Sequence, residues 1–176
     1  STKEDLLTLL NKKSTSSKYY LTNDIDLEGN TIIPQCYLLG NGEFNGNGHA
    51  IRNFKLCLSD YSKDVDEYWW GSTSRYEYYA GLFKSNTGTI KNLTLDSYEF
   101  TIDFNSIQKP SASSSTSSYY YEASYLYVGT LCAINQGTIS NVVIISPTQK
   151  FSLSIGGVYY IGNICAKDIN TGNSIT

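Results

Sequence analysis

Charged residues are scarce in this chain of 176 residues: they make up 16% of it, and the formal net charge is −3. A nucleic-acid-binding domain carries a cluster of Lys and Arg that neutralises phosphates, and the sequence has no such cluster. Long apolar runs are lacking too. A membrane-spanning helix needs about 20 consecutive apolar residues, so we expect no nucleic-acid partner and no membrane-spanning segment, and no secretion signal is visible in this stretch.

Histidine occurs once, at His49, and the cysteines show neither CxxC nor Cys/His spacing of the kind that binds zinc. One histidine does not support a Ser/His/Asp arrangement, so we expect His49 at a surface or corner. Asp24 and Asp26 could chelate calcium, but only Asn23 and Glu28 offer further oxygen ligands nearby. Hydrogen bonding at a corner is the preferred interpretation of these carboxylates, and we expect no metal and no cofactor.

What the sequence does contain is an internal repeat of about 40 residues. Its copies are YAGLFKSNTGTIKNLTL (79–95), YVGTLCAINQGTISNVVI (127–144), a shortened YIGNICAKDINTGNSIT (160–176) and a fainter GEFNGNGHAIRNFKL (42–56). Superposition aligns one isoleucine from each copy, at spacings of 39, 49 and 36 residues: Ile51, Ile90, Ile139 and Ile175. Such self-similarity predicts stacked units, each burying its apolar face against its neighbours.

The apolar spacing within one repeat requires a bend. Ile90, Leu93 and Leu95 cannot share one face of a straight strand, because successive side chains alternate. Asn92 lies where the bend is needed, and Asn tolerates a left-handed backbone. We therefore expect the equivalent asparagines to stack as a ladder of side-chain amides: Asn53, Asn92 and Asn141.

A second bend is expected at the shared glycines Gly81, Gly129 and Gly162. The repeats are rich in β-branched residues, Gly and Asn, which disfavour helix. The predicted fold is therefore all-β: a β-solenoid whose short strands stack about 4.8 Å apart. We expect residues 1–176 to form one such domain with two long inserts, 57–78 and 97–126, and the sequence to be part of a longer protein.

The segment 1–13 has the one helical pattern. Thr2 followed by Asp5 resembles a capping box, and Leu6, Leu7 and Leu10 form an apolar stripe. A stack of strands exposes strand edges at its end. We expect this helix to cover the first repeat, in preference to binding a partner.

The cysteines leave their redox state open. Cys132 and Cys165 share a repeat position and are expected to stack, preferably as packed thiols and alternatively as a disulfide. Cys36 and Cys57 fall near the first repeat and could pair, but sequence alone does not fix connectivity.

The order of the motifs resembles one known family. A leucine-containing helix precedes YYLTNDIDL (19–27), FNGNGHAIRNF (44–54), AGLF (80–83) and GTIKNLTL (88–95). This order resembles the GLUG-motif repeat proteins of bacterial surfaces, found in adhesins and in immunoglobulin A protease-type proteins. The resemblance implies a right-handed parallel β-helix of pectin-lyase-like shape, an extracellular location at the bacterial cell surface, and motif residues that are structural and not catalytic. The chain departs from the pattern in its later repeats, which lack the full GLF core, and in its two long inserts.

Function is expected in the inserts, because loops on a rigid scaffold commonly carry it. Flat aromatic rings stack on sugars and bury much area in protein recognition, although these rings could equally pack back on the outer wall. Insert 57–78 combines aromatic residues with acids, and insert 97–126 ends in SYYYEASYL. The candidate ligand-binding residues are Trp69, Trp70, Tyr68, Tyr76, Tyr78 and Tyr120.

The leading hypothesis is a non-catalytic adhesion module that binds a host glycan or a host or matrix protein through these inserts. One alternative is a structural stalk or spacer, for which short corners would suffice. The other is a polysaccharide-acting enzyme, which would need convergent carboxylates on successive repeats. The superposed repeats offer Arg52, Lys84 and Lys91 instead, so we expect no catalytic residues.

Overall fold

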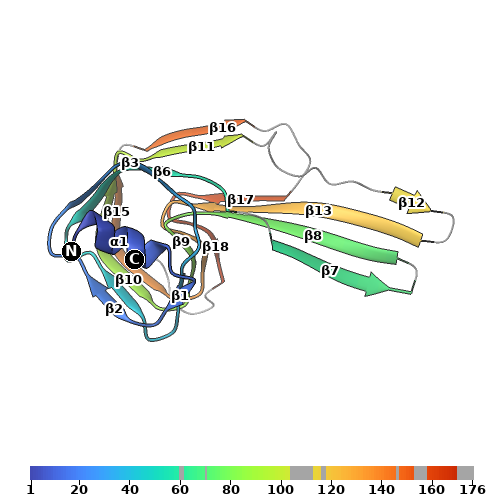
Figure 1. The fold of residues 1–176 in the computed structure, drawn as a ribbon, viewed down its shortest axis with the longest axis horizontal. Coiled ribbons are helices and arrows are strands. Elements are labelled where there is room, and N and C mark those ends of the chain that lie inside the picture. The colour runs from blue at the N-terminus through green and yellow to red at the C-terminus, as the bar shows by residue number, and fades with distance from the viewer. Residues whose placement is uncertain are drawn as a thin grey trace.

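The computed structural model describes residues 1–59, 62–69, 71–103, 113–115, 118–145, 147–152 and 158–169, with backbone alone for 101–103, 113–115, 118–123 and 149–152. It is 63% strand, arranged in three sheets. A compact head holds most of the elements, and part of the third sheet projects from it as a long arm (Figure 1). The arm is defined here as residues 62–69, 71–78, 113–115 and 118–126.

The first sheet is wholly parallel and lies within the head. Its strand order is β1-β4-β9-β14-β18. The strands are β1 (Ser14–Thr15), β4 (Tyr37–Leu38), β9 (Phe83–Asn86), β14 (Cys132–Asn135) and β18 (Cys165–Asp168). Cys132 pairs with Phe83 on one side and with Cys165 on the other. The predicted stacking of the two cysteines is therefore confirmed.

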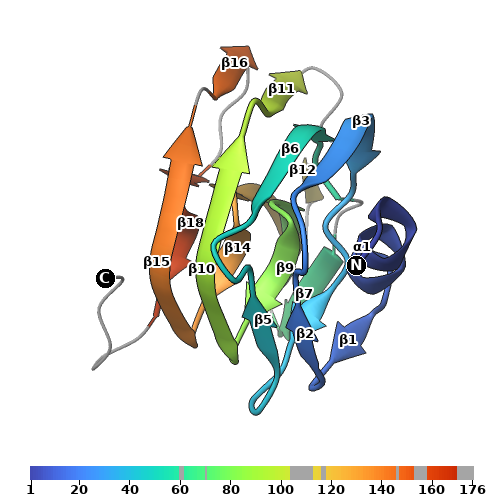
Figure 2. The same cartoon turned by 90° about the vertical axis from the view of Figure 1, so that its left-hand side faces the viewer.

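The second sheet is also wholly parallel, with the order β16-β11-β6-β10-β5-β2, while β15 pairs with β10 and β3 with β6 (Figure 2). The strands are β2 (Lys18–Tyr20), β3 (Ile25–Ile32), β5 (Glu43–Asn45), β6 (Ala50–Leu56), β10 (Thr89–Asp96), β11 (Glu99–Asp103), β15 (Thr138–Ile145) and β16 (Thr148–Ser152). Apolar residues of these strands, such as Ile51, Ile90 and Leu95, are fully buried in the core.

The third sheet is mixed, and its outer part forms the arm. It follows the order β12-β13-β8-β7, with β17 paired to β13. Its strands are β7 (Ser62–Tyr68), β8 (Gly71–Ala80), β12 (Ser113–Ser115), β13 (Ser118–Gly129) and β17 (Val158–Gly162). β8 and β13 run parallel from the Gly71–Tyr119 pair to the Ala80–Val128 pair, whereas β7 and β12 join them antiparallel.

The expected right-handed parallel β-helix, a closed solenoid of pectin-lyase-like shape, is wrong. The described strands form two parallel sheets and one mixed sheet. The physical reason lies in the segments expected to be inserts. Residues 57–78 contribute β7 and most of β8, and residues 97–126 contribute β11, β12 and most of β13. They extend the sheets away from the head, and hairpins lengthen the third sheet outward.

The register of the repeats is partly as predicted. Ile90 pairs with Ile139. Ile51 pairs instead with Leu95, and the partner of Ile90 in the first repeat is Phe44. The cause is the turn between β5 and β6, where Asn47 and Gly48 have φ of 52° and 84°. This turn contains more residues than the single bend at Asn92 in β10, so the strands of the earliest copy pair out of register with the alignment of the sequence repeats. Ile175 lies outside the described residues.

The asparagine bends are confirmed, and the ladder is confirmed in part. Asn53, Asn92 and Asn141 all have positive φ, between 50° and 53°. Asn141 Nδ2 donates to Asn92 Oδ1 at 2.9 Å, and Asn92 Nδ2 donates to Asn45 Oδ1 at 3.2 Å. Asn53 leaves the ladder and donates to Asp26 Oδ2 at 2.8 Å. The shifted register explains why Asn45 takes the place expected for Asn53.

Helix α1 (Lys3–Leu10) is shorter than the expected 1–13 and covers one end of the stack, beside β1–β3 (Figure 2). Its capping box is confirmed: Thr2 Oγ1 accepts from the Asp5 N–H, and Asp5 Oδ2 accepts from the Thr2 N–H. Leu6, Leu9 and Leu10 are buried in the core. Lys3 Nζ also contacts Glu28 Oε2 at 2.6 Å, which ties the helix to β3.

Candidate functional site

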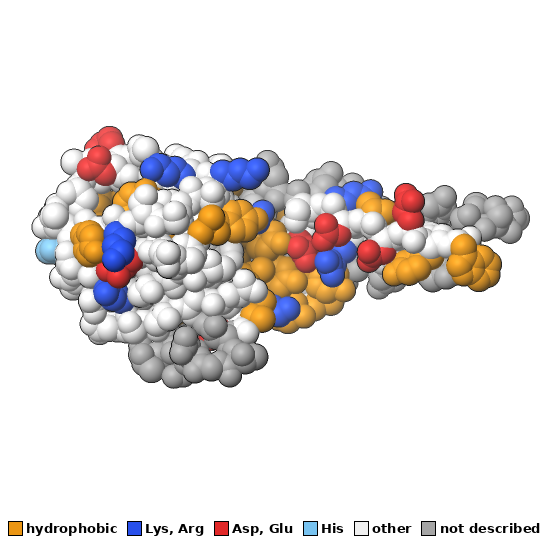
Figure 3. All heavy atoms as spheres, turned by 90° about the horizontal axis from the view of Figure 1, so that it is seen from below, with side chains coloured by type: hydrophobic (Ala, Val, Ile, Leu, Met, Phe, Trp, Pro, Cys, Tyr) orange, Lys and Arg blue, Asp and Glu red, His pale blue; other side chains and the backbone are white. Residues whose placement is uncertain are grey.

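The arm ends in a hairpin turn that carries an exposed tryptophan. β7 and β8 pair antiparallel, and the last pair before the turn is Tyr68 with Gly71. Trp69, in the turn, is 96% exposed, and Tyr68 is 48% exposed. Seen from below, hydrophobic side chains gather where the arm leaves the head and again near its outer end (Figure 3). Trp70 lies outside the described residues.

Cross-strand contacts hold this hairpin in shape. Arg75 Nη2 on β8 donates across the hairpin to Asp64 Oδ2 on β7 at 3.0 Å, and Arg75 Nε also lies 3.3 Å from Glu77 Oε1 on its own strand. On the other face, Lys63 Nζ lies 5.3 Å from the centre of the Tyr76 ring. Directly opposed pairs of this kind are the unit of sheet stabilisation. The turn is therefore presented by a regular two-stranded support.

Four of the six predicted binding residues do not have described side chains at an exposed surface: Trp70 and Tyr120, whose side chains lie outside the described part, and Tyr76 and Tyr78. Tyr76 and Tyr78 are buried, with 3% and 6% exposure, and belong to the main hydrophobic core. They point to one side of β8, because side chains two apart share a face. This placement corrects the expectation that they line an open surface. Tyr120 pairs with Ser72 through its backbone, and its side chain lies outside the described part.

A stack of tyrosines lies where the arm joins the head. Tyr127 is sandwiched between Tyr79 and Tyr160, with ring centroids 5.4 and 5.1 Å away and interplanar angles of 15° and 2°. Lys84 Nζ lies 4.4 Å from the centre of the Tyr79 ring, and burial raises the pKa of the Tyr79 phenol. Both faces of Tyr127 are covered by its neighbours, so the central ring offers no open face to a sugar.

The sequence contains a signal for this stack, although none of its three tyrosines was among the predicted binding residues. All three tyrosines occupy the first position of their repeat, in YAGLF, YVGTL and YIGNI. Parallel pairing in register then places Tyr79, Tyr127 and Tyr160 side by side. Identical aromatic residues at one repeat position predict a ladder of rings.

A groove of about 430 Å³ lies on the second sheet, along β3, β6, β11 and β16. Lys55 Nζ and Glu99 Oε2 lie 3.5 Å apart there. The groove is lined by Gly29, Asn53, Phe54, Lys55, Ser97, Tyr98, Glu99 and Thr148. The rings of Phe54 and Tyr98 stack on each other and are 1% exposed. The groove therefore presents paired charges and backbone but no free aromatic face.

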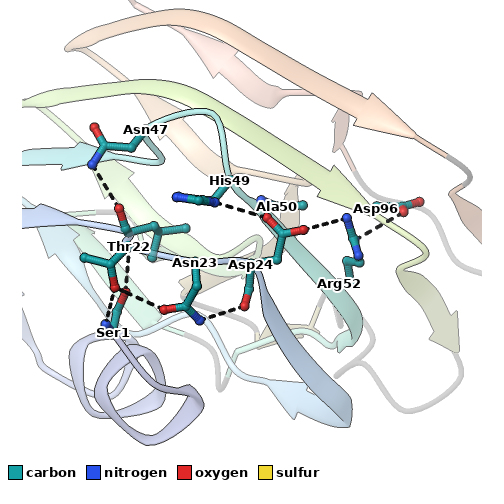
Figure 4. Close-up of polar contacts among 10 residues, drawn as sticks. Ser1, Thr22, Asn23, Asp24, Asn47, His49, Ala50, Arg52 and Asp96 are labelled. Atoms are coloured by element: carbon teal, nitrogen blue, oxygen red, sulfur yellow. Dashed lines mark hydrogen bonds and ion pairs between the residues drawn. The ribbon is translucent and has the colours of Figure 1, made fainter.

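Asp24 organises a polar cluster on the head (Figure 4). Its carboxylate accepts from the Ala50 N–H at 3.0 Å and from Arg52 Nη2 at 2.7 Å, and His49 Nδ1 lies 3.3 Å away. Arg52 Nε also lies 3.7 Å from Asp96 Oδ2. The Ala50 N–H, followed by the charge of Arg52, holds the pKa of Asp24 below its usual range.

Asp26 is fixed in the same way. Its Oδ1 accepts from the Glu28 N–H at 2.7 Å, and its Oδ2 accepts from Asn53. These bonds lower the pKa of Asp26, the backbone donor having the larger effect. The expected corner role of Asp24 and Asp26 is confirmed. Within the described ranges, no group of three or more His, Cys, Asp or Glu side chains is placed to hold a metal ion.

None of the four cysteines forms a disulfide in the structure. Cys36 and Cys132 are fully buried. Burial raises the pKa of Cys36 and of Cys165 to about 11, and that of Cys132 well above its ordinary value. A thiol acts as a nucleophile through its thiolate form. These three thiols are therefore protonated and unreactive at neutral pH.

Comparison of the chain with protein-family models, curated proteins and solved structures finds no match. The resemblance to GLUG-motif proteins therefore stays a prediction. Among the helices that the structure describes, none is long and apolar enough to cross a membrane.

Proposed function

We propose that this protein is a non-catalytic adhesion module on the outside of a bacterial cell, and that the tip of its arm binds a host glycan or host matrix protein. One observation carries the proposal: Trp69 is 96% exposed in a turn at the end of an arm that projects from the head (Figure 1). An aromatic side chain buries 150–250 Å² when covered. At about 25 cal/mol per Å², that burial is worth about 4–6 kcal/mol.

The chemistry around Trp69 suits a ligand that carries both apolar and hydroxyl groups. An uncovered indole ring can stack on the C–H face of a sugar or on an apolar side chain. Tyr68 adds a second half-exposed ring with a hydroxyl group. Asp66 and Glu67, exposed on the strand that leads to the turn, supply acceptors for ligand hydroxyl groups. The ion pair of Arg75 with Asp64 stabilises the hairpin in the absence of ligand, so less conformational entropy is lost when a ligand binds.

The two alternatives fit the geometry less well. A stalk or spacer does not require a solvent-exposed tryptophan at the end of a projecting hairpin. A polysaccharide-acting enzyme needs a general acid, usually a carboxyl group with a raised pKa. Hydrogen bonds lower the pKa of both Asp24 and Asp26, so both are ionised at neutral pH. Adhesion through the arm is the function that the site supports best.

The test is a binding screen of the folded chain on a glycan array and a panel of matrix proteins. For any ligand found, Trp69→Ala is expected to raise Kd at least about 30-fold, since a hot-spot residue contributes 2 kcal/mol or more. Tyr68→Ala should weaken binding less. Tyr20→Ala is the matched control, because Tyr20 has the same 48% exposure as Tyr68 but lies in the head on β2.

Two outcomes would contradict the proposal. One is unchanged binding by Trp69→Ala with the circular dichroism spectrum of the parent protein retained. The other is equal loss of binding in Tyr20→Ala and Tyr68→Ala, which would move the site to the head. A well-folded chain that binds nothing on either panel would favour the stalk.

A further inference from the structure

A row of polar side chains crosses four neighbouring strands of the second sheet. Thr31 on β3 pairs in register with Lys55 on β6, which pairs in register with Glu99 on β11. Glu99 pairs in turn with Thr148 on β16. Figure 2 shows these four strands side by side at the top of the sheet. Residues paired in register point to the same face, so the four side chains stand in one line, about 4.8 Å apart from strand to strand.

The groove of about 430 Å³ lies along this row, and every member of the row except Thr31 lines it. Three further lining residues have left-handed backbone: Gly29, Asn53 and Ser97, with φ of 77°, 53° and 50°. A left-handed residue interrupts the straight course of its strand, and interruptions at neighbouring places on adjacent strands hollow the surface. The volume falls within the range of about 300–1,000 Å³ that is typical of small-molecule sites.

The floor of the groove is apolar and fixed in place. Phe54 and Tyr98 line it, and their rings stack 5.4 Å apart at an interplanar angle of 13°. Both residues belong to the main hydrophobic core. Tyr98 Oη also accepts from Thr130 Oγ1 at 2.7 Å, which fixes the far end of its ring. A ligand therefore meets a site that is formed before binding, and little of the protein has to be ordered around it.

Lys55 and Glu99 present a donor and an acceptor side by side above this floor. Nζ and Oε2 lie 3.5 Å apart, and the two side chains are 52% and 46% exposed. An ammonium group only donates hydrogen bonds and a carboxylate only accepts them, whereas a hydroxyl group does both. Two adjacent hydroxyl groups of a ligand can therefore accept from Lys55 and donate to Glu99 at the same time, without separating the two charges.

The same pair disfavours charged and flat aromatic ligands. An anion lying over the pair is repelled by Glu99, and a cation is repelled by Lys55. Within the described ranges, no group of three or more His, Cys, Asp or Glu side chains is placed to hold a metal ion. A heteroaromatic ring finds no stacking partner, because Phe54 and Tyr98 are each 1% exposed. The chemistry that fits is a neutral ligand rich in hydroxyl groups.

We propose that this groove is a binding site for a neutral sugar. Lys55 and Glu99 hold two adjacent hydroxyl groups of one sugar ring, and the hydroxyl group of Thr148 bonds a third. Every residue that lines the groove belongs to the head. The site is thus separate from Trp69 at the tip of the arm, and it exists whether or not the tip binds a host ligand.

The experiment is a titration of the isotope-labelled whole chain with free sugars, followed by the chemical shifts of its amide groups. The probes are glucose, galactose and mannose, together with the uronate and the 2-amino form of each. At least one neutral sugar should shift the amide signals of Lys55 and Glu99 in a saturable way. Its two charged forms should bind more weakly, because each meets a like charge in the groove. The indole N–H signal of Trp69 reports separately on the arm.

Four variants locate the site. Lys55→Ala and, separately, Glu99→Ala should each weaken binding at least about tenfold, because each removes a hydrogen bond to a charged group. Thr148→Phe should abolish binding by filling the groove. Lys91→Ala is the matched control: Lys91 forms the same kind of pair with Glu43, at 3.3 Å in the same sheet, but lies outside the groove. It should bind as the parent protein does, and thermal melts show that each variant is folded.

Unmoved groove amides with all three neutral sugars would overturn the proposal, as would shifts confined to Trp69. Tighter binding of a uronate or an amino form than of its neutral sugar would refute the neutral ligand class. An equal loss of binding in Lys91→Ala and Lys55→Ala would remove the site from the groove. Trp69→Ala should leave the titration unchanged, so this proposal and the adhesion proposal fail separately.

Discussion

Replacing Tyr127 with leucine tests whether the tyrosine stack is a principal support for the junction of arm and head. Tyr127 is 7% exposed and stacks on Tyr79 and on Tyr160, at 5.4 and 5.1 Å between ring centroids. Leucine keeps most of the apolar burial but makes neither stacking contact. Each stacked aromatic pair is worth about 0.5–1.5 kcal/mol beyond its buried area. Tyr127→Leu should therefore lower the free energy of unfolding by about 1–3 kcal/mol.

The neighbouring ring provides the internal comparison. Tyr160 has one stacked tyrosine, Tyr127, together with Lys167 Nζ at 5.5 Å from its ring centre. Tyr160→Leu loses a single stacking contact, so the loss should be about half of that in Tyr127→Leu. Tyr20→Leu, at an exposed site outside the stack, should change the free energy of unfolding by less than about 0.5 kcal/mol.

Urea titration followed by circular dichroism measures these differences, provided that the slope of unfolding free energy against urea stays constant across the variants. For a chain of this size, 1 kcal/mol corresponds to about 2–4 °C in Tm. The reasoning is refuted if Tyr127→Leu unfolds within about 0.5 kcal/mol of the parent protein, or if Tyr160→Leu is the more damaging of the two.

Three further predictions concern the head. Gly88→Ala should lower the free energy of unfolding by more than about 3 kcal/mol, because a Cβ at Gly88 would lie 2.3 Å from the Gly42 carbonyl oxygen. A Cβ at Gly48 meets open space, so Gly48→Ala should cost only the strain of its left-handed backbone, about 1–2 kcal/mol. Urea titration compares the two variants. The pKa of Asp24 is lower in the folded protein than in the unfolded chain, so ionised Asp24 stabilises the fold above the unfolded-state pKa of about 3.9, and this contribution is lost as the pH falls through the folded-state pKa. The loss of stability in Asp24→Asn at neutral pH should therefore shrink in acid, as thermal melts across pH would show. Cys132, fully buried with a raised pKa, should resist iodoacetamide at pH 8 in the native state and react in urea, as mass spectrometry can determine.

The later repeats could be predicted from the sequence because they agree at several positions at once. Ile90 with Ile139, Cys132 with Cys165 and the bend at Asn92 all lie where the pattern placed them. The earliest copy could not be placed by the same alignment. Its turn at Asn47 carries extra residues, and a shift of register changes which apolar residues pair without changing the pattern itself.

The arm could not be predicted, for a different reason. β7 has the sequence SKDVDEY, which shows no apolar face, so periodicity gives no sign of a strand. Its structure depends on pairing with β8, including the contact of Arg75 with Asp64. Residues 57–78 therefore resembled a loop in sequence, and only tertiary context distinguishes the exposed Trp69 from the buried Tyr76 and Tyr78.

Among the described strands, those at the edges of the sheets differ in charge. β7, at the edge of the arm, has four charged residues among seven, whereas β15 and β17 have none. Charge on an edge strand opposes pairing with another chain. The arm is thus protected along its length while its tip exposes Trp69. A ligand is therefore expected to contact the arm at its tip and not along the edge of β7.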